Sequence, residues 1–88
     1  MITHVAIEQN GEVYSLPRPM RHHHVIKMMV DICGLPTPIT GKQGFLDVDQ
    51  GKYIFVDRRD ALDIARGCRQ VLHKENIRGS QLFSEDIW

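Results

Sequence analysis

The sequence predicts an α+β fold in which two β-hairpins are each followed by a helix, in the order β-β-α-β-β-α. Apolar residues alternate on both sides of two short turn sequences, which is the pattern of antiparallel hairpins. After each hairpin, apolar residues recur at helical spacing, which is typical of a helix with one buried face. Short connections favour antiparallel pairing, so both helices are expected to pack on one sheet within a single domain, residues 1–88.

The first hairpin is predicted around Asn10-Gly11, a preferred two-residue turn between residues 2–7 and 12–16. Two prolines then end the second strand, and the later one suits the first position of a helix. Apolar residues at helical spacing predict that this helix covers about residues 19–33. Gly34 follows as its natural C-terminal end.

The second hairpin is predicted from residues 44–48 and 52–56, which are rich in aromatic and β-branched side chains. Its last strand leads directly into Asp57, which is placed to cap the second helix. That helix is expected to end between Gly67 and His73, because a glycine within the helical pattern weakens it.

Residues 74–81 are polar and predicted to form a loop, followed by the two apolar pairs Leu82-Phe83 and Ile87-Trp88. So much apolar surface in this tail predicts that it docks on its own or a neighbouring subunit. A domain this small has a thin core, and chains of this size commonly gain stability by associating. We therefore expect a homo-oligomer.

Charge and composition exclude several classes of partner. Eleven cationic and eleven anionic side chains give no net charge, so the field that attracts proteins to duplex nucleic acid is absent. The sequence has no long apolar run and no secretory leader, so neither a membrane span nor export is expected. Cys33 and Cys68 are expected on the inner faces of the helices, as buried thiols without a disulfide.

Cationic residues crowd the starts of both predicted helices. Arg18 and Arg21 accompany three histidines at the first start, and Arg58 and Arg59 open the second. A helix N-terminus carries about half a positive charge, so cations there are disfavoured unless an anion lies nearby. We therefore predict an anion site at each start. The alternative is a solvated surface corner, with Asp57 as local countercharge.

The three histidines, His22, His23 and His24, do not form a metal-binding pattern. Neighbours on a helix point about 100° apart, so no two of them can share a metal as an i, i+4 pair would. His22 is in line with the apolar stripe of the helix. It is expected either to be a hydrogen-bonded core histidine or to gain a proton when a phosphate binds beside it.

Signals for catalysis are missing from the sequence. It contains no nucleophile motif, and residues 40–44 lack the glycine spacing of a phosphate-binding loop. Binding without chemistry is therefore the predicted activity, with no catalytic residue, metal or cofactor. An enzyme that cleaves a phosphate ester remains an alternative, because a histidine lies near arginines.

The order of motifs resembles that of a group of small phage-encoded proteins. The resemblance is carried by residues 18–23, 43–46, 55–65 and 82–88. Within that group the chain is similar to the Thoeris anti-defence sponges, which capture a cyclic ADP-ribose-type immune signal without cleaving it. The resemblance implies a homo-oligomer with pockets at subunit interfaces, where arginines hold phosphates and an aromatic ring stacks on the base.

Carried onto this sequence, the resemblance assigns the phosphate to Arg21, Arg58 and Arg59, and the base to Phe45 or Trp88. It implies sequestration of a cyclic-nucleotide or cyclic ADP-ribose-type signal in the cytoplasm of the infected bacterial host. The alternatives are a phosphodiesterase-like enzyme and a structural or protein-interaction phage factor. The chain departs from the related pattern after its second helix, where Cys68-Arg-Gln70 replaces Ala-Gly-Gln.

Overall fold

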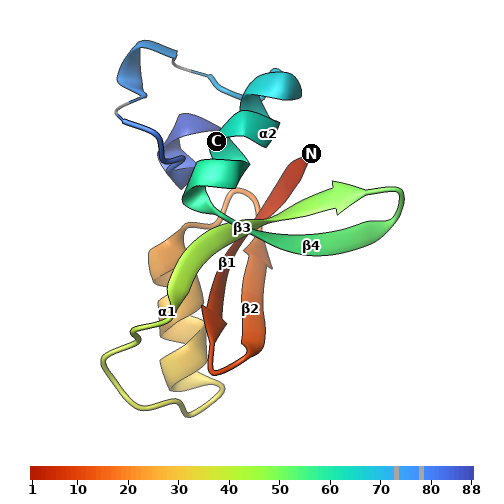
Figure 1. Ribbon diagram of the computed structural model, residues 1–88. Helices are drawn as coiled ribbons and strands as arrows, with labels where there is room; N and C mark the ends of the chain where they lie inside the picture. Colours follow the sequence, from red (N-terminus) through yellow and green to blue (C-terminus); the bar gives the residue numbers. More distant parts are fainter. Residues whose placement is uncertain (73, 78) are drawn as a thin grey trace.

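A computed structural model of the chain describes residues 1–72, 74–77 and 79–88, and in these residues four strands form one antiparallel sheet in the order β2-β1-β3-β4 (Figure 1). The elements are β1 (Ile2–Gln9), β2 (Glu12–Pro17), α1 (His22–Asp31), β3 (Lys42–Asp49), β4 (Lys52–Asp57), α2 (Arg58–Gly67), and the 3₁₀ helices η1 (Lys74–Asn76) and η2 (Ser84–Asp86). The predicted α+β fold and its element order are confirmed.

Both hairpins close through two-residue turns that require a left-handed backbone. Asn10 and Gly11 have φ values of 53° and 82°, and Gln50 and Gly51 have values of 49° and 77°. Positive φ at both central residues is the geometry of a type I′ turn, whose twist matches that of the flanking strands. These turns fix the register, which pairs Gln9 with Glu12 in the first hairpin.

The core lies between the sheet and the two helices. α1 packs on β1 and β2, whereas α2 packs mainly on β3 and β4. The buried apolar cluster takes residues from every layer, including Val5 from β1, Phe45 from β3, Met29 from α1 and Leu62 from α2. One continuous core therefore holds the starts of both helices in fixed positions.

Helix α1 begins three residues later than predicted. Met20 N–H donates to the carbonyl oxygen of Pro17 at 3.0 Å, so the residues around Pro19 form a turn instead of the first helical turn. Arg21 is the N-cap, with an extended backbone, and its N–H donates to Nδ1 of His24 at 2.9 Å. Pro19 and Arg18 consequently lie outside the helix.

The prediction of buried thiols is wrong, because Cys33 and Cys68 are both exposed. Each lies just beyond its helix, after the end of α1 at Asp31 and after the end of α2 at Gly67. A residue past the last helical turn no longer follows the buried face of that helix. Gly67 is the earlier of the two predicted ends of α2, and His73, the later one, lies outside the described residues.

The C-terminal tail, residues 82–88, docks on its own chain. This was one of the two predicted alternatives, the other being a neighbouring subunit. Leu82 is completely buried, and its N–H donates to the carbonyl oxygen of Arg58 at 2.9 Å. Ile87 is also buried in the core, and the indole N–H of Trp88 donates to the carbonyl oxygen of Met20 at 2.8 Å. The apolar tail is thus covered within one subunit and no longer argues for an oligomer.

Candidate functional site

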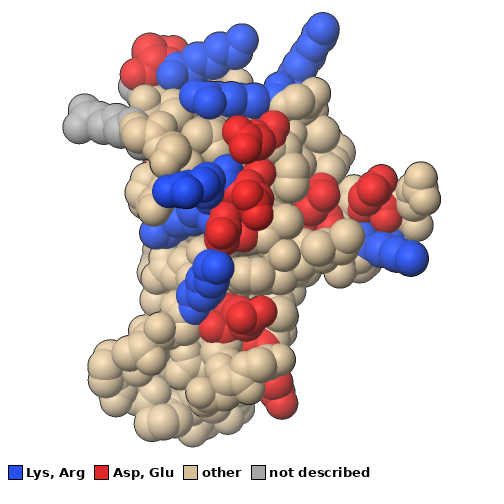
Figure 2. Space-filling view, in the orientation of Figure 1, with Lys and Arg blue, Asp and Glu red and all other residues tan. Residues whose placement is uncertain are grey.

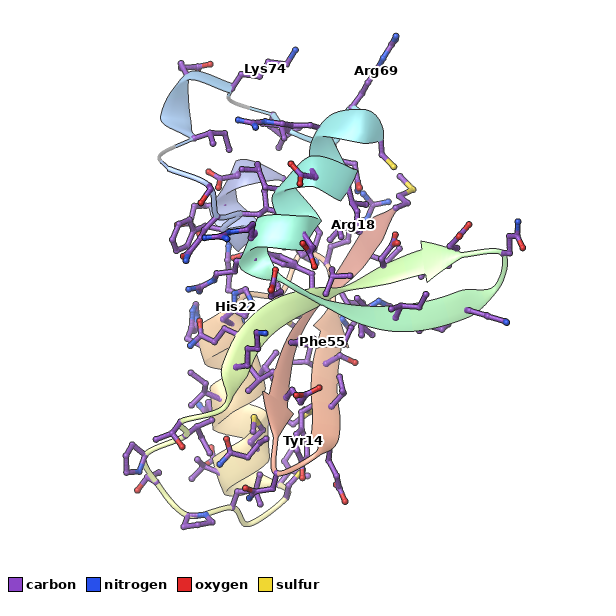
Figure 3. All side chains as sticks on the ribbon, in the orientation of Figure 1. Tyr14, Arg18, His22, Phe55, Arg69 and Lys74 are labelled. Carbon is purple, nitrogen blue, oxygen red and sulfur yellow. The ribbon has the colours of Figure 1, made fainter. Side chains whose placement is uncertain are left out.

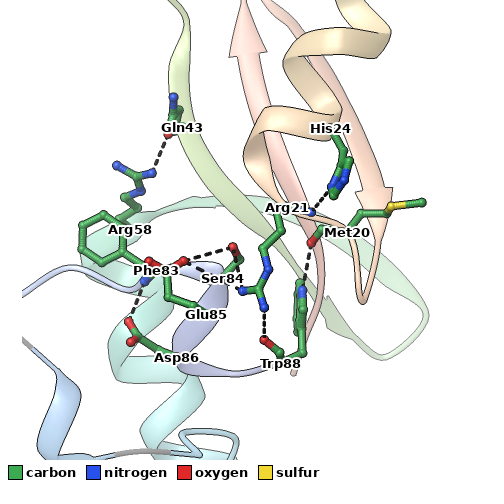
Figure 4. A network of polar contacts seen from close by, with 10 residues as sticks. All are labelled: Met20, Arg21, His24, Gln43, Arg58, Phe83, Ser84, Glu85, Asp86 and Trp88. Atoms are coloured by element: carbon green, nitrogen blue, oxygen red, sulfur yellow. Dashed lines mark hydrogen bonds and ion pairs between the residues drawn. The ribbon is translucent and has the colours of Figure 1, made fainter.

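The two cationic helix starts lie on either side of the C-terminal tail. Figure 4 shows Arg21, at the start of α1, directed toward Ser84 and Trp88 of the tail, and Arg58, at the start of α2, directed toward Gln43 with the Phe83 ring beside it. The tail lies between them because Leu82 and Ile87 are anchored in the core on either side of η2. Its polar groups therefore determine how much countercharge each arginine already has.

Arg21 is held in a network with the tail. One of its terminal nitrogens, Nη2, donates to the main-chain oxygen of Trp88 at 2.7 Å, and the other, Nη1, donates to Oγ of Ser84 at 3.3 Å. The same Nη1 forms an ion pair with the carboxylate of Glu85 at 3.9 Å. The protein itself thus supplies Arg21 with two hydrogen-bond acceptors and one carboxylate, in place of the anion predicted for the first helix start.

The guanidinium of Arg58 has different contacts from that of Arg21. Its Nη2 donates to the side-chain oxygen of Gln43, and its guanidinium lies 4.6 Å from the centre of the Phe83 ring. Nε is buried without a hydrogen-bond partner. Burial lowers the pKa of Arg58, and the negative charge of Glu85 raises it. Within the described part of the chain, no carboxylate lies at ion-pair distance from Arg58, so this cation is partly desolvated and incompletely neutralised.

An open groove of about 450 Å³ lies beside Arg58. Its lining residues are Gly41, Lys42, Gln43, Asp57, Arg58, Arg59 and Gln81. They include three cationic side chains and one carboxylate, that of Asp57.

The Asp57 carboxylate is the local countercharge in this groove, but it is shared. It accepts a hydrogen bond from the backbone N–H of Asp60 at 2.8 Å, as predicted for an N-cap, and lies 3.6 Å from Nζ of Lys42. The Asp60 amide is the main cause that lowers the pKa of Asp57, and Lys42 adds to it. Asp57 is therefore ionised at neutral pH, and the groove still carries an excess of positive charge.

The sheet register explains how this groove forms. β3 and β4 pair Gly44 with Asp57. This is the last pair of the ladder, and the chain of β4 turns there into α2. The two residues before Gly44 therefore lie beside the start of the helix, where Gln43 accepts from Arg58 and Lys42 forms an ion pair with Asp57. The sequence analysis missed Lys42 and Gln43, because it predicted that this strand begins at residue 44, whereas β3 begins at Lys42. Gln81 lines the groove because the tail that follows it docks on α2. No local sequence pattern predicts this contact.

His22 is a core histidine, which was one of the two predicted alternatives. Its Nε2 donates to the carbonyl oxygen of Gly44 at 2.7 Å, and its ring meets the edge of Phe45 at a centroid distance of 5.1 Å. Burial is the main cause that lowers its pKa, and nearby Arg58 acts in the same direction, whereas the bond to Gly44 and the charge of Glu85 raise it. His22 therefore packs as a neutral ring in the protein interior, against Phe45.

The two aromatic side chains that were predicted to contact a ligand base pack against other residues of the chain. Phe45 is 0% exposed, so the assignment of this ring to a ligand base is wrong: it lies in the core against His22 and Trp88. Trp88 is half-buried and joins Phe45 edge-on at 6.3 Å. Arg18 is exposed on the turn before α1 and does not line the groove. Of the predicted site residues, the groove brings together Arg58 and Arg59.

The family of the chain follows from comparison with models of protein families. The model of the phage T4 y16D protein family matches residues 1–88. The chain belongs to this family. A comparison with curated proteins gave no match, and neither did a comparison with solved structures. The predicted phage origin is thus confirmed for this y16D-family chain, and the more specific Thoeris resemblance is a hypothesis about function that we take up below.

Two further properties bear on the y16D-family chain. Among the described residues, no helix has the length and apolar character needed to cross a membrane. The same part of the chain brings no three His, Cys, Asp or Glu side chains together as a metal site. Figure 2 shows acidic and basic side chains intermingled on one face, in agreement with the zero net charge, so no continuous basic surface is seen there.

Burial of His22 predicts a pH-dependent stability. Its pKa in the folded protein lies below the ordinary value of 6.5, so on acidification the unfolded chain takes up a proton that the folded chain resists. The free energy of unfolding should therefore decrease as the pH falls below about 6.5.

Urea unfolding at pH 7.5, 6.5 and 5.5 measures this dependence. The His22→Gln variant should have a flatter profile, whereas His23→Gln, which alters an exposed histidine, should keep the wild-type slope. Parallel profiles for wild type and His22→Gln would show that another group controls the pH dependence.

Proposed function

We propose that this y16D-family protein binds a phosphate-bearing nucleotide in the groove at the start of α2 and holds it without cleavage. The observation that carries the proposal is the state of Arg58, a partly buried cation with no carboxylate at ion-pair distance within the described chain. A phosphate would supply the missing countercharge through charge-assisted hydrogen bonds. Lys42 and Arg59 line the same groove and would add to the attraction.

The N-terminus of α2 favours the same class of ligand. The helix has ten residues, and its dipole places partial positive charge at the groove. Asp57 already satisfies one first-turn amide, so the arginines and Lys42 would make the principal contacts. The seven described lining residues include no histidine, serine, threonine or cysteine, so they offer no hydroxyl or thiol nucleophile with a histidine base, which favours binding over cleavage by that route.

The resemblance to Thoeris anti-defence sponges suggests the biological use of such binding. In this proposal the protein sequesters a cyclic-nucleotide or cyclic ADP-ribose-type immune signal in the cytoplasm of the infected bacterium and so counters anti-phage defence. The groove is open, and a second subunit placed over it would complete a closed pocket. We therefore include in the proposal a homo-oligomer with its ligand at the interface.

A protein-interaction factor is the second candidate, and one observation favours it. β4 is an edge strand of the sheet, and its Tyr53 and Ile54 side chains are 62% and 50% exposed. An edge strand can pair with a strand of another protein. A factor of this kind would not deplete a small nucleotide from solution, so a ligand-depletion experiment separates the two functions.

Titration calorimetry with cyclic ADP-ribose tests the groove directly. Arg58→Ala should weaken binding about 10- to 100-fold, because a hydrogen bond to a charged group contributes about 1.5–3 kcal/mol. Arg59→Ala should have a smaller effect, since its side chain is exposed. Arg18→Ala removes an equal charge away from the groove and is the matched control. Equal affinities for all three variants and wild type would refute the groove.

The fate of the ligand tests sequestration against cleavage. The protein is incubated with cyclic ADP-ribose, the free nucleotide is measured, and the protein is then heated to release what it holds. Sequestration predicts depletion followed by recovery of the intact nucleotide by mass spectrometry. A product opened at the pyrophosphate would indicate a phosphodiesterase-like enzyme, and the absence of depletion would favour the interaction factor.

A further inference from the structure

A second cavity, larger than the groove, lies at the opposite end of α2. It has a volume of about 700 Å³ and is lined by Arg66, Arg69, Val71, Lys74 and Ile77. Figure 3 shows Arg69 and Lys74 at the same end of the molecule, far from His22. None of these five lining side chains is acidic, although the chain as a whole has no net charge.

The apolar part of this cavity belongs to the fold. Val71 and Ile77 are partly buried and pack against the core, so they form a stable aliphatic surface between the cations. The volume falls within the roughly 300–1,000 Å³ that is typical of small-molecule sites. An aliphatic surface beside guanidinium groups suits the face of a planar aromatic ring, and the positive charges suit phosphate groups.

The backbone at Arg69 offers a second, independent observation. The N–H of Gln70 donates to the carbonyl oxygen of Ala65 at 2.8 Å, and that of Arg69 to Arg66 at 3.2 Å. These two bonds form a Schellman motif, in which the residue at the position of Arg69 is usually glycine. Arg69 nevertheless occupies it with φ of 57°. An arginine in a conformation that favours glycine suggests that its charge is used.

We propose that this cavity is a second ligand site that binds a small anion composed of a planar aromatic ring and at least two negative charges, the composition of a nucleoside diphosphate. Arg66, Arg69 and Lys74 hold the charged part, and the Val71–Ile77 surface accepts the ring. The proposal is independent of the groove, since the two sets of lining residues share no member. A protein without affinity at the groove could still bind here.

The test uses adenosine diphosphate as the probe, with adenosine and pyrophosphate as its uncharged and ring-free halves. Amide chemical shifts in a two-dimensional nitrogen–proton NMR titration show where each probe binds. We expect adenosine diphosphate to perturb Arg69, Gln70 and Val71 and to bind more tightly than either half. Perturbation confined to the amides of Lys42, Gln43 and Arg58 would refute the second site.

Variants at Arg69 separate charge from backbone conformation. Arg69→Asn tolerates the left-handed backbone but removes the charge, and should weaken binding about three- to tenfold. Arg69→Lys retains the charge and should bind nearly as well as wild type. Arg18→Ala, which removes an equal charge from a residue that lines neither cavity, should leave this binding unchanged. Wild-type affinity in both Arg69→Asn and Lys74→Gln would overturn the proposal.

Discussion

Replacing Leu82 with alanine is expected to lower the free energy of unfolding by about 2–5 kcal/mol, the range for removing a buried leucine side chain. Leu82 is 0% exposed and belongs to the central apolar cluster. Its backbone also joins the tail to the first residue of α2. The truncation leaves a cavity at the junction of tail, helix and sheet, and urea denaturation monitored by circular dichroism measures the loss.

Leu72→Ala is the matched control for this experiment. Leu72 is 61% exposed, and surface substitutions of this kind usually change stability by less than about 0.5 kcal/mol. If Leu82→Ala were as stable as Leu72→Ala, the tail could not be packed against the core in solution. The same result would remove the basis for the contacts of Arg21 and Arg58 with residues 83–88.

The tail matters for function because its contacts with the arginine at the start of α1 differ from those with the arginine at the start of α2. Trp88, Ser84 and Glu85 all contact Arg21, whereas Phe83 gives Arg58 an aromatic ring and no formal charge. Both arginines occupy similar places in the sequence pattern. Only Arg58 is left at an open groove with its charge incompletely neutralised.

Local patterns were sufficient for most of the fold. Asn10-Gly11 adopts the φ values that a type I′ turn requires, because few other residue pairs tolerate them. Asp57 caps α2 through the amide of Asp60, as the sequence spacing predicted. These features depend on residues that are close in the chain, so the sequence contains the information directly.

The features that the sequence analysis missed depend on contacts between distant residues. Phe45 was assigned to a ligand, but the packing of both helices and the tail makes it a core residue. Arg21 was assigned to a phosphate, but its partners lie more than sixty residues away, in the tail. Residue type alone cannot distinguish an arginine that is free to bind a ligand from one that is already paired within the protein.

Gly44→Ala is the second substitution with a large expected effect. A Cβ at this position would lie 2.1 Å from the carbonyl oxygen of Val56 and 2.8 Å from Cζ of Phe55. The Val56 oxygen is backbone, so it cannot move away without disturbing the pairing of β3 with β4, which joins Gly44 to Asp57. The carbonyl oxygen of Gly44 also accepts the hydrogen bond from His22. Overpacking of this kind costs about 3 kcal/mol.

Gly67→Ala is the matched control for Gly44→Ala, because a Cβ at Gly67 would meet no atom of the described residues within 4 Å, its chain neighbours and the backbone of its own helix apart. Gly67 is the last residue of α2, and alanine is favoured over glycine in a helix by up to about 1 kcal/mol. Thermal unfolding should therefore show a lower midpoint for Gly44→Ala and an unchanged or higher midpoint for Gly67→Ala. If Gly44→Ala unfolded at the wild-type temperature, β4 would have to lie farther from β3 in solution. The pairing of Gly44 with Asp57, which brings Gln43 to Arg58 and Lys42 to Asp57, would then be incorrect, and the groove with it.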